Sequence, residues 1–193
     1  MFRQLQHRFQ SMRTLSRLCT GAEAHARASG QAAPGAEHFL LAAIDLPDGS
    51  ARRALESMGV APAAVRDAIE QQYRDALRSV GLDATLPQAP ALAPPAPGLY
   101  RAQPSGQEVM QTLARSRKSQ GGPLLGAHVV AAVATMPHGV AARTLRAMGI
   151  DADQLVAVAE AEFRAEVGHD VATVVAIGLE AYAGGDGAGM LMR

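Results

Sequence analysis

The sequence is poor in the residues that build all-β and disulfide-stabilised folds. It has no tryptophan, an aromatic share of 4 %, and a single cysteine, Cys19. Strands favour aromatic and β-branched side chains, so this composition favours packed helices over a β-sandwich. One cysteine cannot form an internal disulfide, which agrees with a reducing compartment, and we expect a cytoplasmic protein.

The chain also lacks an excess of charge of either sign and any long apolar run. Its 18 basic and 18 acidic residues give a formal net charge of zero. A generally basic, nucleic-acid-binding surface is therefore not expected. No apolar run reaches the roughly 18 residues that span a bilayer, so no membrane association is expected either. The 193 residues, 48 % of them hydrophobic, can form one large core or two small ones.

The N-terminal 22 residues contain four arginines and no acid. Arg-rich, acid-poor openings occur in organelle transit peptides, which is one interpretation. The other is a core helix, because apolar residues recur at three- and four-residue steps from Phe2 to Cys19 and continue into Ala22 and Ala26. This continuity favours a helix over about 3–28, which Thr20-Gly21 could interrupt.

Internal duplication is the strongest feature of the sequence. Residues 35–60 match residues 125–150 at an offset of 90, without a gap. The matched residues are His38 with His128, Pro47 with Pro137, Gly49 with Gly139, Ala51 with Ala141, Arg53 with Arg143, Leu55 with Leu145, Met58 with Met148 and Gly59 with Gly149. A repeat of this kind predicts a supersecondary unit that occurs twice.

Each copy reads as a set of short helices. Residues 37–45 have no polar face, which is typical of a helix in the middle of a bundle. Ser50 is expected to cap the next helix, Gly59 to end it, and Pro62 to open a fourth. The second copy is expected to have helices at about 105–119, 127–135, 140–148 and from Asp151 or Asp153 onward.

Proline divides the chain. Six prolines fall between Gly81 and Gly106, which predicts an extended linker. We therefore expect a first repeat at 1–80, a linker at 81–104, a second repeat at 105–167 and an extra segment at 168–193. Within that last part, residues 171–182 are apolar and suggest a ninth helix, although their valines leave a strand open.

Three segments of the first copy resemble the Clp repeat, the amino-terminal domain of the ClpC and ClpA AAA+ unfoldases. They are ARASG at 26–30, GAEHFLL at 35–41 and ARRALESMGV at 51–60. The resemblance extends over about residues 10–165. It implies an all-α fold of two tandem four-helix repeats related by a pseudo-twofold axis, with the C-terminal segment as an addition.

The resemblance also implies a protein-binding module. In the unfoldases this domain binds adaptors and substrates, and in some members it binds phosphorylated arginine through a motif glutamate in each repeat. Carried over, that glutamate is Glu37, with His38, Arg52 and Arg53 as further ligand-binding candidates; the second copy has Ala127 instead. The family's partner groove has a phenylalanine in each repeat.

The partner-facing candidates in this chain are accordingly Phe2, Phe9 and Tyr100. No phosphate-binding Gly-x-x-x-x-Gly-Lys motif is present, so a standalone, non-enzymatic Clp-repeat protein without ATPase modules or cofactors is expected. Its expected partners are adaptors, clients and arginine-phosphorylated peptides. The histidines are scattered, which predicts no metal site, and Cys19 lacks a base at helical spacing. A DNA-linked or small-ligand-binding regulator on the same scaffold is the alternative.

Overall fold

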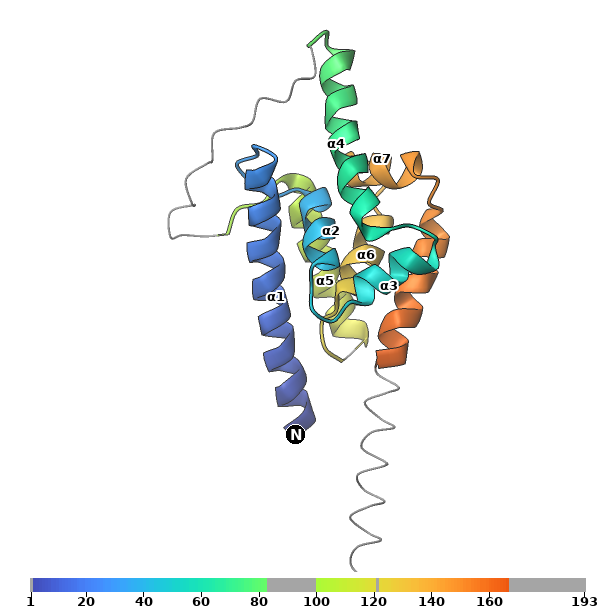
Figure 1. Ribbon diagram of the computed structural model, residues 1–193. Coiled ribbons are helices and arrows are strands. Elements are labelled where there is room, and N and C mark those ends of the chain that lie inside the picture. The colour runs from blue at the N-terminus through green and yellow to red at the C-terminus, as the bar shows by residue number, and fades with distance from the viewer. Residues whose placement is uncertain (1, 83–99, 121, 167–193) are drawn as a thin grey trace, which may run out of the picture.

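The computed structural model describes residues 2–82, 100–120 and 122–166, and within these residues every regular element is a helix (Figure 1). The first copy comprises α1 (Phe2–Ala28), α2 (Ala36–Ile44), α3 (Ser50–Ser57) and α4 (Pro62–Ser79). The second comprises α5 (Pro104–Gln120), α6 (Gly126–Ala134), α7 (Val140–Ala147) and a last helix at 152–166. The predicted all-α fold is confirmed. The predicted ninth helix, 171–182, lies outside the described residues.

Helix α1 is continuous, so the break considered at Thr20-Gly21 is wrong. Gly21 stays helical because α1 and α2 approach closely at this point. A Cβ atom on Gly21 would lie 3.1 Å from the Cβ of Ala42, tighter than normal contact. The glycine is therefore needed for packing between the two helices and does not interrupt the first.

The expected cap of α3 is also wrong. Ser50 is the first helical residue, and the N-cap is Gly49, whose φ of 67° is left-handed. Asp48 provides the capping carboxylate instead, because its Oδ1 accepts the Ser50 N–H at 2.9 Å. The stops were predicted correctly: Gly59 and Gly149 have φ values of 73° and 71°.

Helices α2 and α6 form the centre of the molecule. All nine residues of α2 are buried, as predicted from its lack of a polar face. α2 packs against α1, α5 and α6, and α3 also contacts α6 (Figure 1). A Cβ on Gly126 would lie 2.9 Å from the carbonyl oxygen of Ala43, so the two copies meet with almost no space between them.

One hydrophobic cluster includes residues of both copies. Its fully buried members include Leu18, Phe39 and Leu55 from the first copy and Val129 and Leu155 from the second. The expected division at 1–80, 81–104 and 105–167 stays a prediction, but the two helical units share a single core. The N-termini of α2 and α6 are positioned by that core.

Candidate functional site

The motif histidine organises the start of α2. His38 Nδ1 accepts the Gly35 N–H at 2.9 Å, so Nε2 carries the proton and donates to Ser29 Oγ, also at 2.9 Å. Burial lowers the pKa of His38, which keeps the ring neutral at pH 7. His128 repeats the bond, accepting the Leu125 N–H at 3.2 Å. The histidines therefore act as helix-start caps.

The motif glutamate lies inside the protein. Glu37 is 2 % exposed, and its Oε1 accepts a hydrogen bond from the Tyr73 hydroxyl at 2.7 Å. Burial and the nearby Glu37 charge raise the pKa of Tyr73, which therefore stays a donor. Arg143 of α7 lies close enough to influence the same phenol. A Cβ on Gly35 would lie 2.6 Å from Oε1, so the carboxylate covers the backbone at Gly35.

The second copy has an apolar pair in the corresponding place. Ala127 replaces the glutamate, and Phe163, at the position of Tyr73, stacks on His128 with ring centroids 4.4 Å apart. Both members of the hydrogen-bonded pair have therefore been exchanged together. Nothing in the local motif around Ala127 indicated the second exchange, but the 90-residue offset, continued to Phe163, would have revealed it.

The second copy lacks the motif carboxylate, since it has Ala127 at that position, but a carboxylate from the first copy lies at the start of α6. Asp48, from the turn between α2 and α3, reaches the N-terminus of α6 and lies with both carboxylate oxygens 3.3 Å from the Gly126 nitrogen. Ser50 Oγ accepts the Ala127 N–H at 2.9 Å and donates to Asp48. A carboxylate at a helix N-terminus is favourable. The first copy thus supplies a carboxylate to the N-terminus of α6, where Ala127 has none.

The two predicted arginines do not meet Glu37. Arg52 Nε donates to the carbonyl of Ile44, the last residue of α2, at 3.1 Å. Glu37 lies at the opposite end of this nine-residue helix, roughly 12 Å long. Arg53 Nε pairs with Glu162 of the last helix at 2.7 Å. The four predicted ligand residues therefore form a buried pair, Glu37 and His38, and two separate surface contacts.

Of the partner-facing candidates, Phe9 is 66 % exposed and Tyr100 36 %. Tyr100 packs edge-on against Phe39, with ring centroids 6.4 Å apart, and burial together with the nearby Cys19 raises the pKa of its hydroxyl. The side chain of Phe2 is outside the described part of the structure. Two residues that had been assigned to the buried stripe, Leu5 and Met12, are instead 51 % and 66 % exposed.

The reason for this correction is that α1 carries two apolar faces. Leu18, Ala22 and Ala26 point into the core, and Ser11 beside them is fully buried and accepts the Leu124 N–H at 3.0 Å. Leu5, Phe9 and Met12 follow at four- and three-residue steps on another face, away from the core. We refer to these three residues as the α1 stripe. Periodicity alone merged the two faces into one.

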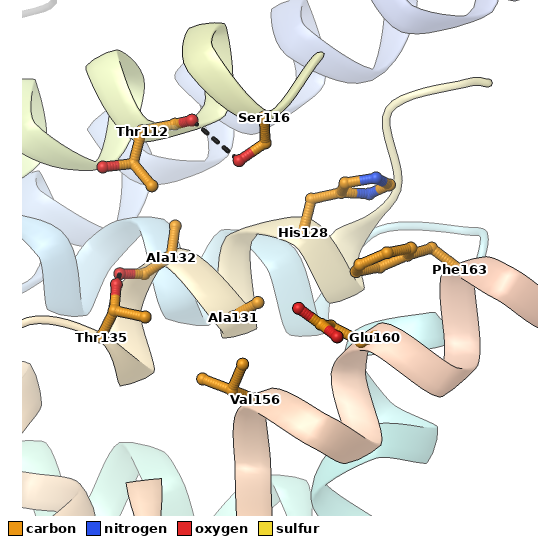
Figure 2. Close-up of a pocket in the computed structure, with 9 residues that line it drawn as sticks. All are labelled: Thr112, Ser116, His128, Ala131, Ala132, Thr135, Val156, Glu160 and Phe163. Atoms are coloured by element: carbon orange, nitrogen blue, oxygen red, sulfur yellow. Dashed lines mark hydrogen bonds between the residues drawn. The ribbon is translucent and has the colours of Figure 1, made fainter. Parts of the chain in front are cut away.

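A small pocket of about 120 Å³ opens between α5, α6 and the last helix (Figure 2). Ala131 forms its floor, where the first copy has the buried Leu41. Val156 and Thr135 line the pocket at the positions of Arg66 and Asp45. The first copy has a pocket of about 300 Å³ at the corresponding place, lined by Leu41, Asp45 and Arg66, so both copies are hollowed here and only the lining differs. Glu160 provides the charged group of its lining.

Within the described ranges, no group of three or more His, Cys, Asp or Glu side chains is arranged for a metal ion. Burial raises the pKa of Cys19, so its thiol is protonated at pH 7. No helix in the described part of the chain has the length and apolar character needed to cross a membrane.

The fold and these sites define an all-α protein built from two interlocked helical repeats, with a capped motif at the start of each central helix. The family model described as the Clp repeat (R) N-terminal domain matches residues 13–94, from α1 through the whole first copy. Residues 13–94 are thereby identified as a Clp repeat N-terminal domain, a non-catalytic type of domain that mediates protein interactions in the Clp system. No curated protein matches the chain.

Proposed function

We propose that this chain is a non-enzymatic protein-binding module of the cytoplasmic Clp protease system, which takes adaptors or substrates in place of an unfoldase's own amino-terminal domain and so regulates proteolysis. The observation that carries the proposal is the α1 stripe. Leu5, Phe9 and Met12 are 51–66 % exposed and adjacent on one helical face. Large apolar side chains grouped on a surface mark interaction sites, whereas single ones do not.

Tyr100 extends the same surface. It lies near Cys19, which follows Met12 by two helical turns on α1. The binding surface that we propose therefore includes Phe9 and Tyr100, two of the sequence-predicted partner residues, together with Leu5 and Met12. Partner recognition through large aromatic and methionine side chains is typical of protein interfaces.

The test is site-specific photo-crosslinking in native cell extract. A benzophenone amino acid at position 9 should capture Clp adaptors or Clp clients, identified by mass spectrometry. Phe9→Ser in the same chain, with the photoreactive group moved to Met12, should reduce this capture strongly. Gln10→Ser, on an exposed neighbouring face of α1, is the matched control and should leave capture unchanged. Equal capture by both variants, or no Clp component among the products, contradicts the proposal.

We further propose that the substrates include arginine-phosphorylated proteins. A ligand guanidinium at Glu37 would have to replace the Tyr73 hydroxyl at Oε1, because that oxygen already accepts it at 2.7 Å. We therefore expect phosphoarginine to bind the first copy only with displacement of Tyr73. Isothermal titration with phosphoarginine should give heat with the wild type and none with Glu37→Ala; unphosphorylated arginine is the control. Absence of heat with the wild type would contradict phosphoarginine binding, but it would not affect the proposal that partners bind at the α1 stripe.

One observation favours the alternative of a small-ligand-binding protein, namely the pocket at Ala131. Its volume of about 120 Å³ is in the range of a single small group. Refilling it with Ala131→Leu should abolish ligand binding if that alternative holds. The protein-binding function predicts instead that the substitution leaves capture at position 9 unchanged.

A further inference from the structure

The α1 stripe has no cover among the described residues. Leu5, Phe9 and Met12 are all more than half exposed, while the opposite side of the helix is fixed to the body through Ser11, which is 0 % exposed and bonded to Leu124. Three such side chains at four- and three-residue spacing form a continuous apolar ridge. A ridge of this kind on an otherwise charged helix calls for an apolar occupant.

The charges around the stripe restrict what that occupant is. The first 22 residues contain four arginines and no acid, and Arg8 and Arg13, beside the stripe, are exposed. A second copy of this helix would bring like charges together, which opposes self-association. The occupant should therefore combine an apolar face with acidic residues.

The part of the chain that follows the last described helix has this composition. Residues 171–182, VATVVAIGLEAY, contain one acid and no base. Asp170 precedes them and Asp186 follows; the basic residues after residue 166 are His169 and Arg193. Val171, Val175 and Leu179 recur at steps of four, a spacing that places them on one face of either a strand or a helix.

The path is also short. The last helix ends at the same end of the molecule as the N-terminus of α1 (Figure 1). Its Phe163 stacks on His128, and four residues before His128 the Leu124 amide is bonded to Ser11, the neighbour of Met12. Only residues 167–170 separate the last helix from position 171, and this tether reaches on the order of 17 Å when extended.

We propose that residues 171–182 of the same chain bind across the α1 stripe, with the acids of the C-terminal segment facing the arginines of α1. The segment then occupies the surface that we assign to partners, and an incoming adaptor or client must displace it. The competition rests on the proposed function, whereas the intramolecular contact does not.

The contact is testable in the full-length chain by NMR. In a Cys19→Ser background, Ala183→Cys, just after the segment, carries a nitroxide, and 13C-methyl methionine provides the reporter. The Met12 methyl signal should lose most of its intensity relative to the same sample after reduction of the nitroxide. The Met148 methyl, at the end of α7, serves as the reference and should keep its intensity. Val175→Asp, which places a charge on the apolar face of the segment, should restore the Met12 signal.

A matched control and a mixing experiment complete the test. Ala176→Asp adds the same charge away from the apolar face and should leave the Met12 broadening in place. In a mixed sample, one population carries the nitroxide and the other the 13C label, and no broadening is expected. An unaffected Met12 signal, equal effects of the two aspartates, or broadening in the mixed sample, which indicates a second copy as occupant, would each overturn the proposal. None of these readouts depends on whether a Clp partner binds.

Discussion

The two copies of the repeat share a scaffold but differ in the groups buried at its centre. In the first copy, Glu37 and Tyr73 form a buried carboxylate–hydroxyl pair; in the second, Ala127 and Phe163 occupy the same positions. A buried polar group without a partner is costly, whereas an apolar pair of similar shape is nearly neutral. The comparison teaches that the two copies differ in both members of this pair, while the histidine cap beside it is the same in both.

The two copies also differ in how their central helices begin. The α2 N-terminus has its own carboxylate, Glu37, and the α6 N-terminus has Asp48 from the other copy. In the second copy, the position equivalent to Asp48 is His138, which is exposed. The support is therefore reciprocal but unequal: Ser105 Oγ of α5 accepts the Ala36 N–H at the start of α2 at 3.2 Å, whereas the start of α6 receives a carboxylate from the first copy.

The largest effect on stability is expected from Leu41→Ala, which gives the first copy the alanine that the second copy has at position 131. Leu41 is 7 % exposed and part of the shared core. Leu41→Ala should lower the free energy of unfolding by about 3 kcal/mol, from lost burial plus the cavity left behind. Urea unfolding followed by circular dichroism measures it. A loss below about 1 kcal/mol would mean that α2 can close the gap.

The next effect tests whether Glu37 and Tyr73 are a unit. Tyr73→Phe leaves the buried carboxylate without its donor and should cost about 2 kcal/mol. The double variant Glu37→Ala/Tyr73→Phe reproduces the apolar combination of the second copy. Its loss of unfolding free energy should be smaller than the sum of the losses in the two single variants, which a double-mutant cycle in urea measures. Additive losses would show that the carboxylate does not depend on the hydroxyl.

Much of this fold followed from pattern alone. The helix starts and stops repeat at a fixed offset, and the left-handed stops at Gly59 and Gly149 depend only on the local chain. His38, by contrast, was predicted as a ligand-binding residue, whereas its Nδ1 accepts the Gly35 N–H at the start of α2, as His128 does for Leu125 at the start of α6.

What the sequence could not show are contacts that join distant segments. Asp48 lies in the turn after α2, and its bond to Gly126, 78 residues away, forms only when α3 is packed against α6. In the same way, the spacing of Leu5, Phe9 and Met12 shows that they share a face, but not that the core lies on another side of α1. The predicted ligand set failed to converge for a related reason, since Arg52 and Glu37 lie at opposite ends of α2.

A smaller effect tests the support given by the first copy to the second. Asp48→Ala removes the carboxylate at the α6 N-terminus and the acceptor of the Ser50 N–H, and should cost about 1 kcal/mol. His138→Ala, at the equivalent position of the second copy, is the matched control and should change the stability by less than about 0.5 kcal/mol. Amide hydrogen exchange at Gly126 and Ala127 should rise only in the Asp48 variant. Equal costs at the two positions would remove the asymmetry.

The smallest effect is expected from the reverse exchange in the second copy. Ala131 is half-buried and lines the pocket of about 120 Å³. Ala131→Leu restores the residue of the first copy and should raise the free energy of unfolding by about 0.5–1 kcal/mol, because it fills existing space. The gain should be smaller than the loss in Leu41→Ala, since the pocket is open to solvent and its lining has already adapted to alanine. If Ala131→Leu instead destabilises the chain, α5 and the last helix have closed around the smaller residue, and the two copies differ in helix spacing as well as in side chains.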